Sequence, residues 1–66
     1  MYEKIEYPFQ SFNGVDWTQD GVDSYNQCVE RCNRYISEGR SVESQEWQHL
    51  LNTKHKAFCI SSSLFN

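Results

Sequence analysis

The sequence predicts a mainly α protein, an antiparallel two-helix hairpin preceded by an extended N-terminal arm. Three observations support this prediction. Apolar residues recur at spacings of three and four in two segments, a glycine separates the segments, and an alternating pattern precedes them. If the arm forms a β-hairpin, the class becomes α+β. We expect a single domain over 1–66, with an arm at 1–17, helices at 20–38 and 42–59, and a tail at 60–66.

The first helix is predicted from a stripe of apolar residues spaced like one face of a helix: Val22, Tyr25, Val29, Cys32 and Ile36. Asp20 is the expected N-cap, and Asp23 three residues later would complete an arrangement like a capping box. Thr18 is the alternative cap. Gly39 is expected to end the helix, because glycine adopts a left-handed cap without strain.

The second helix is predicted from a similar stripe, in which two polar residues interrupt the apolar ones: Trp47, Leu50, Leu51, Lys54, His55 and Phe58. Ser41 or Ser44 is the expected N-cap. Each apolar stripe must be buried against another surface. We therefore expect the two helices to pack together as a hairpin, with the short polar break at 38–41 as the connection.

The arm is expected to be extended, because apolar and polar residues alternate over 5–9. Pro8 restricts any strand here to an edge, since it cannot donate a ladder hydrogen bond. Asn13-Gly14 is a strong hairpin signal, because both residues tolerate a positive φ. It is expected to fold 15–17 back on 11–12.

The size of the chain indicates that it needs a second surface. Ordering 66 residues costs roughly 1.5 kcal/mol per residue, which burial must offset. The four Phe, four Tyr and two Trp supply most of the possible core. A two-helix hairpin has too little interior for both stripes and all of these rings. We therefore expect a homodimer with a four-helix arrangement.

Composition also indicates the compartment. No segment approaches the roughly 20 apolar residues that span a bilayer, so no membrane association is expected. The first residues lack the basic start and apolar run of a secretory signal. The three cysteines are an odd number, which suits a disulfide framework poorly. We expect a cytoplasmic protein with reduced thiols.

The best metal-site candidates are one i,i+4 pair on each helix: Cys28 with Cys32, and His55 with Cys59. The hairpin register displaces Cys32 and Cys59 by about a turn, roughly 5 Å, in opposite directions. We therefore expect no metal and no cofactor, with a zinc-stabilised adaptor as an alternative. So short a chain has little room for a substrate cavity of ~300 Å³, so no enzymatic activity is expected.

A basic surface for nucleic acid is another alternative, in the form of a dimeric regulator that uses Arg31, Arg34 and Arg40. Residues 1–30 hold six acids and one base, a net charge of −5, and 31–66 hold five bases and three acids, a net charge of +2. Each helix begins with acids and ends with bases, as the helix dipole favours. The basic ends of an antiparallel hairpin lie apart, which argues against nucleic acid as the partner.

The surplus of aromatic residues with an acidic rim favours binding to a larger protein, since Trp, Tyr and Arg are enriched at binding hot spots. We expect a small protein-binding module, an inhibitor or regulator of phage or mobile-element type that occludes a surface of a host protein. The candidate partner-binding residues are Tyr7, Phe9, Trp17, Arg34 and Tyr35.

Overall fold

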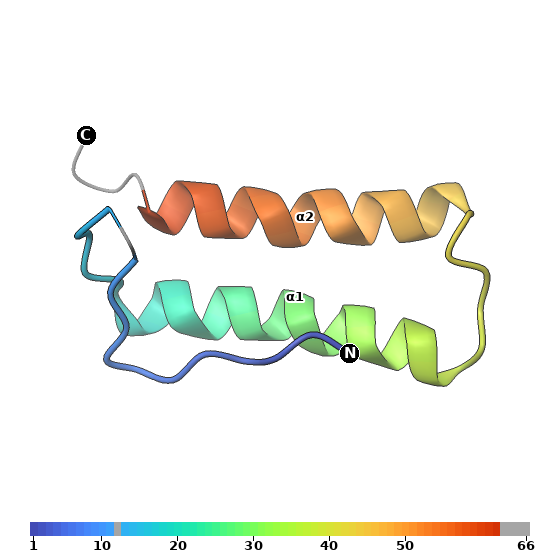
Figure 1. Cartoon of the computed structure of the whole chain (residues 1–66), viewed down its shortest axis with the longest axis horizontal. Coiled ribbons are helices and arrows are strands. Elements are labelled where there is room, and N and C mark those ends of the chain that lie inside the picture. The colour runs from blue at the N-terminus through green and yellow to red at the C-terminus, as the bar shows by residue number, and fades with distance from the viewer. Residues whose placement is uncertain (12, 63–66) are drawn as a thin grey trace.

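Two long helices lie side by side as an antiparallel hairpin in the computed structural model, which describes residues 1–11 and 13–62 (Figure 1). Helix α1 spans Gln19–Ser37 and helix α2 spans Gln45–Ser62. The arm turns at one end of the hairpin and runs back along α1 (Figure 1). The predicted mainly α hairpin is confirmed. Neither helix, over the residues described, is long and apolar enough to cross a membrane.

Helix α1 begins one residue before the expected start, and its N-cap is Thr18. Thr18 has the extended backbone that a cap requires, and its hydroxyl accepts a hydrogen bond from the Gly21 N–H at 3.0 Å. The prediction of Asp20 as the cap is wrong, because Asp20 already lies in the first helical turn. At the other end Gly39 adopts a φ of +72° and its N–H donates to the Ile36 carbonyl, as predicted for this glycine.

Helix α2 begins at Gln45, three residues after the expected start, and Ser44 rather than Ser41 is its cap. The Trp47 N–H donates to Ser44 Oγ at 3.2 Å. The Tyr35 hydroxyl, which hydrogen-bonds the Ser41 carbonyl and Ser44 Oγ, holds this loop against α1. The helix continues to Ser62, beyond the expected end at 59. The rest of the expected tail, 63–66, lies outside the described residues.

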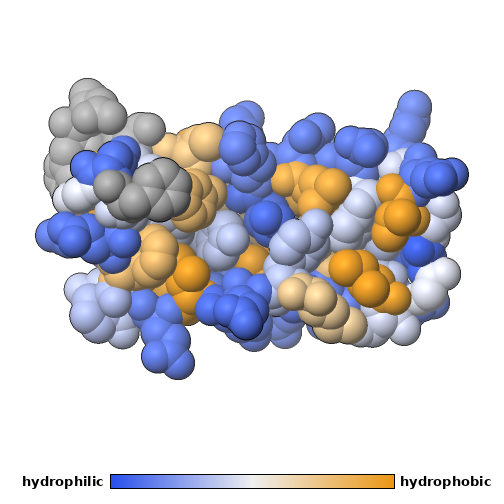
Figure 2. Space-filling model, viewed as in Figure 1, coloured by the Kyte–Doolittle hydropathy of each residue, from blue (hydrophilic) through white to orange (hydrophobic). Residues whose placement is uncertain are grey.

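The core runs along the seam between the helices and includes a residue from just before α1. Its buried apolar side chains are Trp17, Val22, Val29, Cys32, Tyr35 and Trp47. Helix α2 supplies only Trp47 to this set, while Leu50 and Leu51 are half-buried against it. The helices come close together at the end away from their connecting loop, since a Cβ on Gly21 would lie 3.0 Å from Ser61 Oγ. Apolar side chains on the face seen in Figure 2 form separate patches divided by hydrophilic ones.

The bend in the arm is tighter and less regular than a β-hairpin. One antiparallel bridge joins Gln10 and Asp16, and the Ser11 N–H donates to the Val15 carbonyl at 2.9 Å. Gly14 adopts a φ of +87°, as the Asn-Gly turn signal predicted. The described residues contain no strand, because the chain leaves this single bridge at once to start α1. Residue 12, part of the expected pairing, lies outside the described residues.

Two asparagines of α1 hold the arm in its extended path. The Asn26 amide accepts from the Ile5 N–H at 2.9 Å and donates to the Ile5 carbonyl at 2.8 Å. Asn33 makes the same pair of bonds with Tyr2, both at 2.9 Å. Seven helical residues rise about 10.5 Å and three extended residues span about 10 Å, so the two pairs are in register. Sequence reasoning missed this clamp.

Candidate functional site

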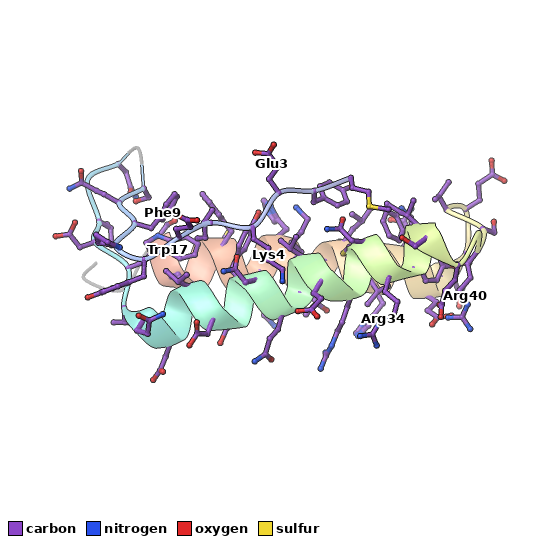
Figure 3. All side chains as sticks on the ribbon, turned by 90° about the horizontal axis from the view of Figure 1, so that it is seen from below. Glu3, Lys4, Phe9, Trp17, Arg34 and Arg40 are labelled. Carbon is purple, nitrogen blue, oxygen red and sulfur yellow. The ribbon has the colours of Figure 1, made fainter. Side chains whose placement is uncertain are left out.

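The five predicted partner-binding residues divide between two hollows at opposite ends of the molecule. The bend hollow measures about 430 Å³ and is lined by Tyr7, Pro8, Phe9, Gln10, Asp16 and Trp17. The loop hollow measures about 180 Å³ and is lined by Arg31, Arg34, Tyr35, Glu38, Arg40, Glu46 and Leu50. The structure therefore brings Tyr7, Phe9 and Trp17 together and places Arg34 beside Tyr35, at the other end of α1. Figure 3 shows Phe9 and Trp17 together, far from Arg34.

Trp17 forms the inner wall of the bend hollow and is only 3% exposed. Its ring meets Phe9, Tyr25 and Phe58 edge to face, with centroid distances of 4.9, 5.8 and 5.1 Å. These contacts join the arm to both helices. Trp17 is thus a core residue whose position fixes the wall, whereas Tyr7 is 52% exposed and is the most accessible ring of the hollow.

Two of the residues that line the bend hollow carry a polar group without a described partner. The Trp17 indole Nε1 is buried and has no hydrogen-bond partner among the described residues. A buried donor in this state costs about 1–3 kcal/mol. Asp16 lines the same hollow and is exposed, and no described lysine or arginine forms an ion pair with it. The bend hollow therefore combines aromatic walls with an unopposed carboxylate.

Acidic groups extend from this hollow along the arm. Glu3 and Glu6 are exposed and take part in none of the ion pairs of the described chain. Figure 3 shows Glu3 pointing outward from the arm, away from the helices. The one base of the arm, Lys4, is paired with Glu30 at 3.3 Å. The arm and the bend thus present net negative charge on one side of the molecule.

The loop hollow has its aromatic ring and one arginine paired within the chain. Its inner wall is Tyr35, a buried residue whose hydroxyl bonds hold the loop. Arg40 lies over the Tyr35 ring at 5.4 Å and forms an ion pair with Glu46 at 2.9 Å. Arg31 and Arg34 line the same hollow without an ion-pair partner in the described part of the chain. Both are exposed, and Figure 3 shows Arg34 pointing away from the arm.

A lysine on the seam between the two helices also has partners within the chain. Lys54, which interrupts the apolar stripe of α2, places its ammonium 4.5 Å from the Tyr2 ring centroid and 5.9 Å from that of Tyr25. With Lys4 and Arg40 in ion pairs, only Arg31, Arg34 and Lys56 are without a described partner. Three such cations are few for nucleic acid, whose affinity depends on several phosphate contacts.

The four candidate metal ligands do not come together. The three cysteines are free thiols, and His55 Nε2 lies 3.5 Å from the Cys59 sulfur on its own helix. Within the described ranges no three His, Cys, Asp or Glu side chains are arranged to hold a metal ion. Burial raises the pKa of the Cys32 thiol, Lys54 opposes this shift and Cys28 adds to it. Cys32 is therefore held as a neutral thiol in the core.

Comparison with known proteins gives no match to a family model, a curated protein or a solved structure. The functional argument therefore depends on the geometry of the two hollows. The bend hollow is the larger of the two, and it alone combines several aromatic rings with an unpaired negative charge.

Proposed function

We propose that the protein is a small protein-binding module that covers a basic surface of a larger protein. In this proposal a lysine or arginine side chain of the partner enters the bend hollow, where it lies against Tyr7 and the aromatic wall and pairs with Asp16. The protein acts by occluding the partner's surface, as an inhibitor or regulator, rather than by catalysis. We place the protein in the cytoplasm, where thiols stay reduced, because its odd number of cysteines suits a disulfide framework poorly.

The observation that carries the proposal is the way this chain already uses its tyrosines. Tyr2 and Tyr25 receive the Lys54 ammonium, and Tyr35 receives the Arg40 guanidinium. No described lysine or arginine lies over Tyr7, Phe9 or Trp17. The electron-rich faces of aromatic rings attract a cation by about 0.5–1 kcal/mol at exposed sites and by more when water is excluded. The bend hollow supports the same interaction with a cation from another molecule.

The charge distribution supports the same kind of partner. The chain carries a net charge of −3, and three of the acids that form no described ion pair, Glu3, Glu6 and Asp16, belong to the arm and bend. Complementary charge raises the rate of association and fixes the orientation of two proteins. Glu3 and Glu6 are therefore expected to affect the association rate, whereas Asp16 and Tyr7 are expected to affect dissociation.

A labelled peptide of alternating glycine and arginine tests the proposal, with a citrulline peptide as its uncharged counterpart. Fluorescence anisotropy should show binding of the arginine peptide that is three- to tenfold tighter than that of the citrulline peptide. Tyr7→Ala and Asp16→Asn should each remove most of this difference. Val42→Ala and Asp23→Asn are matched controls, since Val42 is as exposed as Tyr7 and Asp23 lies outside the hollow.

Two results would contradict the proposal. Equal affinity for the two peptides would show that the hollow does not recognise a cation. Binding of DNA or RNA that weakens steeply with salt and is lost in Arg31→Glu or Arg34→Glu would instead favour the nucleic-acid alternative.

A further inference from the structure

Helix α1 carries a stripe of polar residues on the side away from the arm, and its charge changes sign along the helix. The stripe lines the hollows of this side and consists of Asp20, Ser24, Gln27, Arg31 and Arg34. Their spacings of three and four place them on one face of the helix. Asp20 forms no ion pair with a described residue, and neither do Arg31 and Arg34. The stripe is thus acidic and unpaired at one end, and basic and unpaired at the other.

Such a stripe is complementary to itself in an antiparallel arrangement. Asp20 and Arg34 each lie seven residues from Gln27, which is about 10.5 Å along the helix axis. A two-fold axis at the level of Gln27, perpendicular to α1, therefore places Asp20 opposite Arg34 of a second copy, and the reverse. The symmetry repeats the contact, so Asp20 and Arg34 of each copy both gain a partner of opposite sign.

The neighbouring surface of α2 fits the same arrangement. Tyr35 is level with Trp47, on which it stacks, and Gly21 is level with Ser61, so Gln27 is level with about His55. The same axis then places Ile60 opposite Leu50 of the second copy. Ile60 is 58% exposed and borders a hollow of about 330 Å³ lined by small residues. Leu50 is half-buried at the edge of the loop hollow, where Ile60 of the second copy would lie against it.

We propose that this face of α1 and α2 binds a second copy of the chain, to give a two-fold dimer in which Asp20 of each copy pairs with Arg34 of the other. The arm and the bend hollow lie outside this interface. The dimer therefore presents two bend hollows, and its formation can be tested separately from the binding of a basic partner.

Charge-reversal variants of the full chain provide the test. Arg34→Glu and Asp20→Arg each place like charges opposite one another twice in a dimer, and each should raise the dimer dissociation constant at least tenfold. When the two variants are mixed, opposite charges face each other at every contact, so a heterodimer should form. Glu3→Arg is the control: Glu3 is exposed on the arm and lines none of these hollows, so this variant should dimerise like the unchanged chain.

Analytical ultracentrifugation at low salt measures the association, and circular dichroism confirms that each variant is folded. A monomeric unchanged chain at every concentration would overturn the proposal. So would single variants that dimerise as tightly as the unchanged chain, or a mixture of the two variants that fails to associate. If a variant fails to fold, cross-linking of the unchanged chain by a mild oxidant decides the matter, because Cys28 lies next to the proposed axis. A disulfide that joins Cys28 of two copies supports the proposal, and its absence beside a disulfide through exposed Cys59 contradicts it.

Discussion

Each end of the hairpin has a buried tryptophan, but the contacts around the two tryptophans differ. At the loop end Trp47 stacks on Tyr35 and Tyr2, with centroid distances of 5.2 and 6.3 Å, and the Tyr35 hydroxyl hydrogen-bonds the loop. At the bend end Trp17 meets its neighbouring rings edge to face, and its indole N–H has no described partner. The loop end pairs the Tyr35 hydroxyl and Arg40 internally, while the bend end leaves the Trp17 indole N–H and Asp16 without a described partner.

This difference indicates where a partner would bind. A surface whose charges and donors are already paired offers a partner little that is new, since each contact must replace an existing one. The loop end has Arg40 in place over Tyr35, whereas the bend end has Tyr7, Trp17 and Asp16 without a cation. The bend end therefore has more to gain from binding a basic protein surface.

The largest expected effect comes from removing the tryptophan of the bend end. Trp17→Ala should lower the free energy of unfolding by about 3–5 kcal/mol, because Trp17 is buried against rings of the arm and of both helices. Urea denaturation followed by circular dichroism measures the loss. A loss below 1 kcal/mol would mean that the bend does not pack on the hairpin, and the comparison between the two ends would then fail.

The tyrosine hydroxyls give a smaller effect that distinguishes the two ends. Tyr35→Phe should lower the free energy of unfolding by about 1 kcal/mol, because it removes the hydrogen bonds to Ser41 and Ser44. Tyr25→Phe is the matched control, since no described hydrogen bond involves its hydroxyl, and it should change stability by less than about 0.5 kcal/mol. Equal losses for the two variants would indicate that the loop end is not held by its hydroxyl bonds.

The two asparagines that hold the arm should differ in their contribution to stability. Asn26→Ala should cost about 1 kcal/mol, because the paired bonds to Ile5 are partly buried. Asn33→Ala should cost less, since its bonds to Tyr2 are exposed to water. Hydrogen exchange of the Ile5 and Tyr2 amides measures the release of the arm in each variant. If both amides keep their protection in the two variants, the asparagines do not hold the arm.

The smallest effect concerns pH. Burial raises the pKa of Cys32 above its ordinary value of 9.0, and burial also raises the pKa of Tyr25 above 10.0. The folded state therefore holds these protons more tightly than the unfolded chain does. This contribution to stability is fully present below the unfolded values and is lost as pH rises through the folded ones. Denaturation midpoints should fall above about pH 9, and less so in Cys32→Ala. A fall of the same size in that variant would exclude Cys32 as a cause.

The sequence predicted the parts of the fold that depend on local periodicity. The stripes of both helices, the helix cap at Gly39 and the turn at Gly14 follow from spacing and backbone preference. The start of α2 could not be predicted in this way, because Ser41 and Ser44 are equally suitable cap residues. Both serines are hydrogen-bonded by the Tyr35 hydroxyl, which belongs to the other helix. Composition also does not tell which aromatic rings are surplus. Trp17 and Tyr35, predicted to bind a partner, are buried, while Tyr7 is exposed.

The arm clamp was missed for a related reason. A helical asparagine that pairs with extended backbone leaves no apolar pattern, and its only signal is the repeat of Asn26 and Asn33 seven residues apart beside the apolar stripe. The same holds for Lys54, which appears in the sequence as a break in the stripe and in the structure as a cation placed over two tyrosines. Both features depend on the arm lying across the helices, which residue spacing within one segment does not encode.

The two tryptophans allow the most direct test of the central claim, that the bend end recognises a cation. Each indole N–H gives its own signal in a ¹H–¹⁵N correlation spectrum, so Trp17 reports on the bend hollow and Trp47 on the loop end in the same sample. Titration with the glycine–arginine peptide should shift the Trp17 indole signal progressively and leave that of Trp47 in place, and the citrulline peptide should shift neither. A shift of Trp47 alone, or no shift of Trp17 at saturating peptide, would contradict the account.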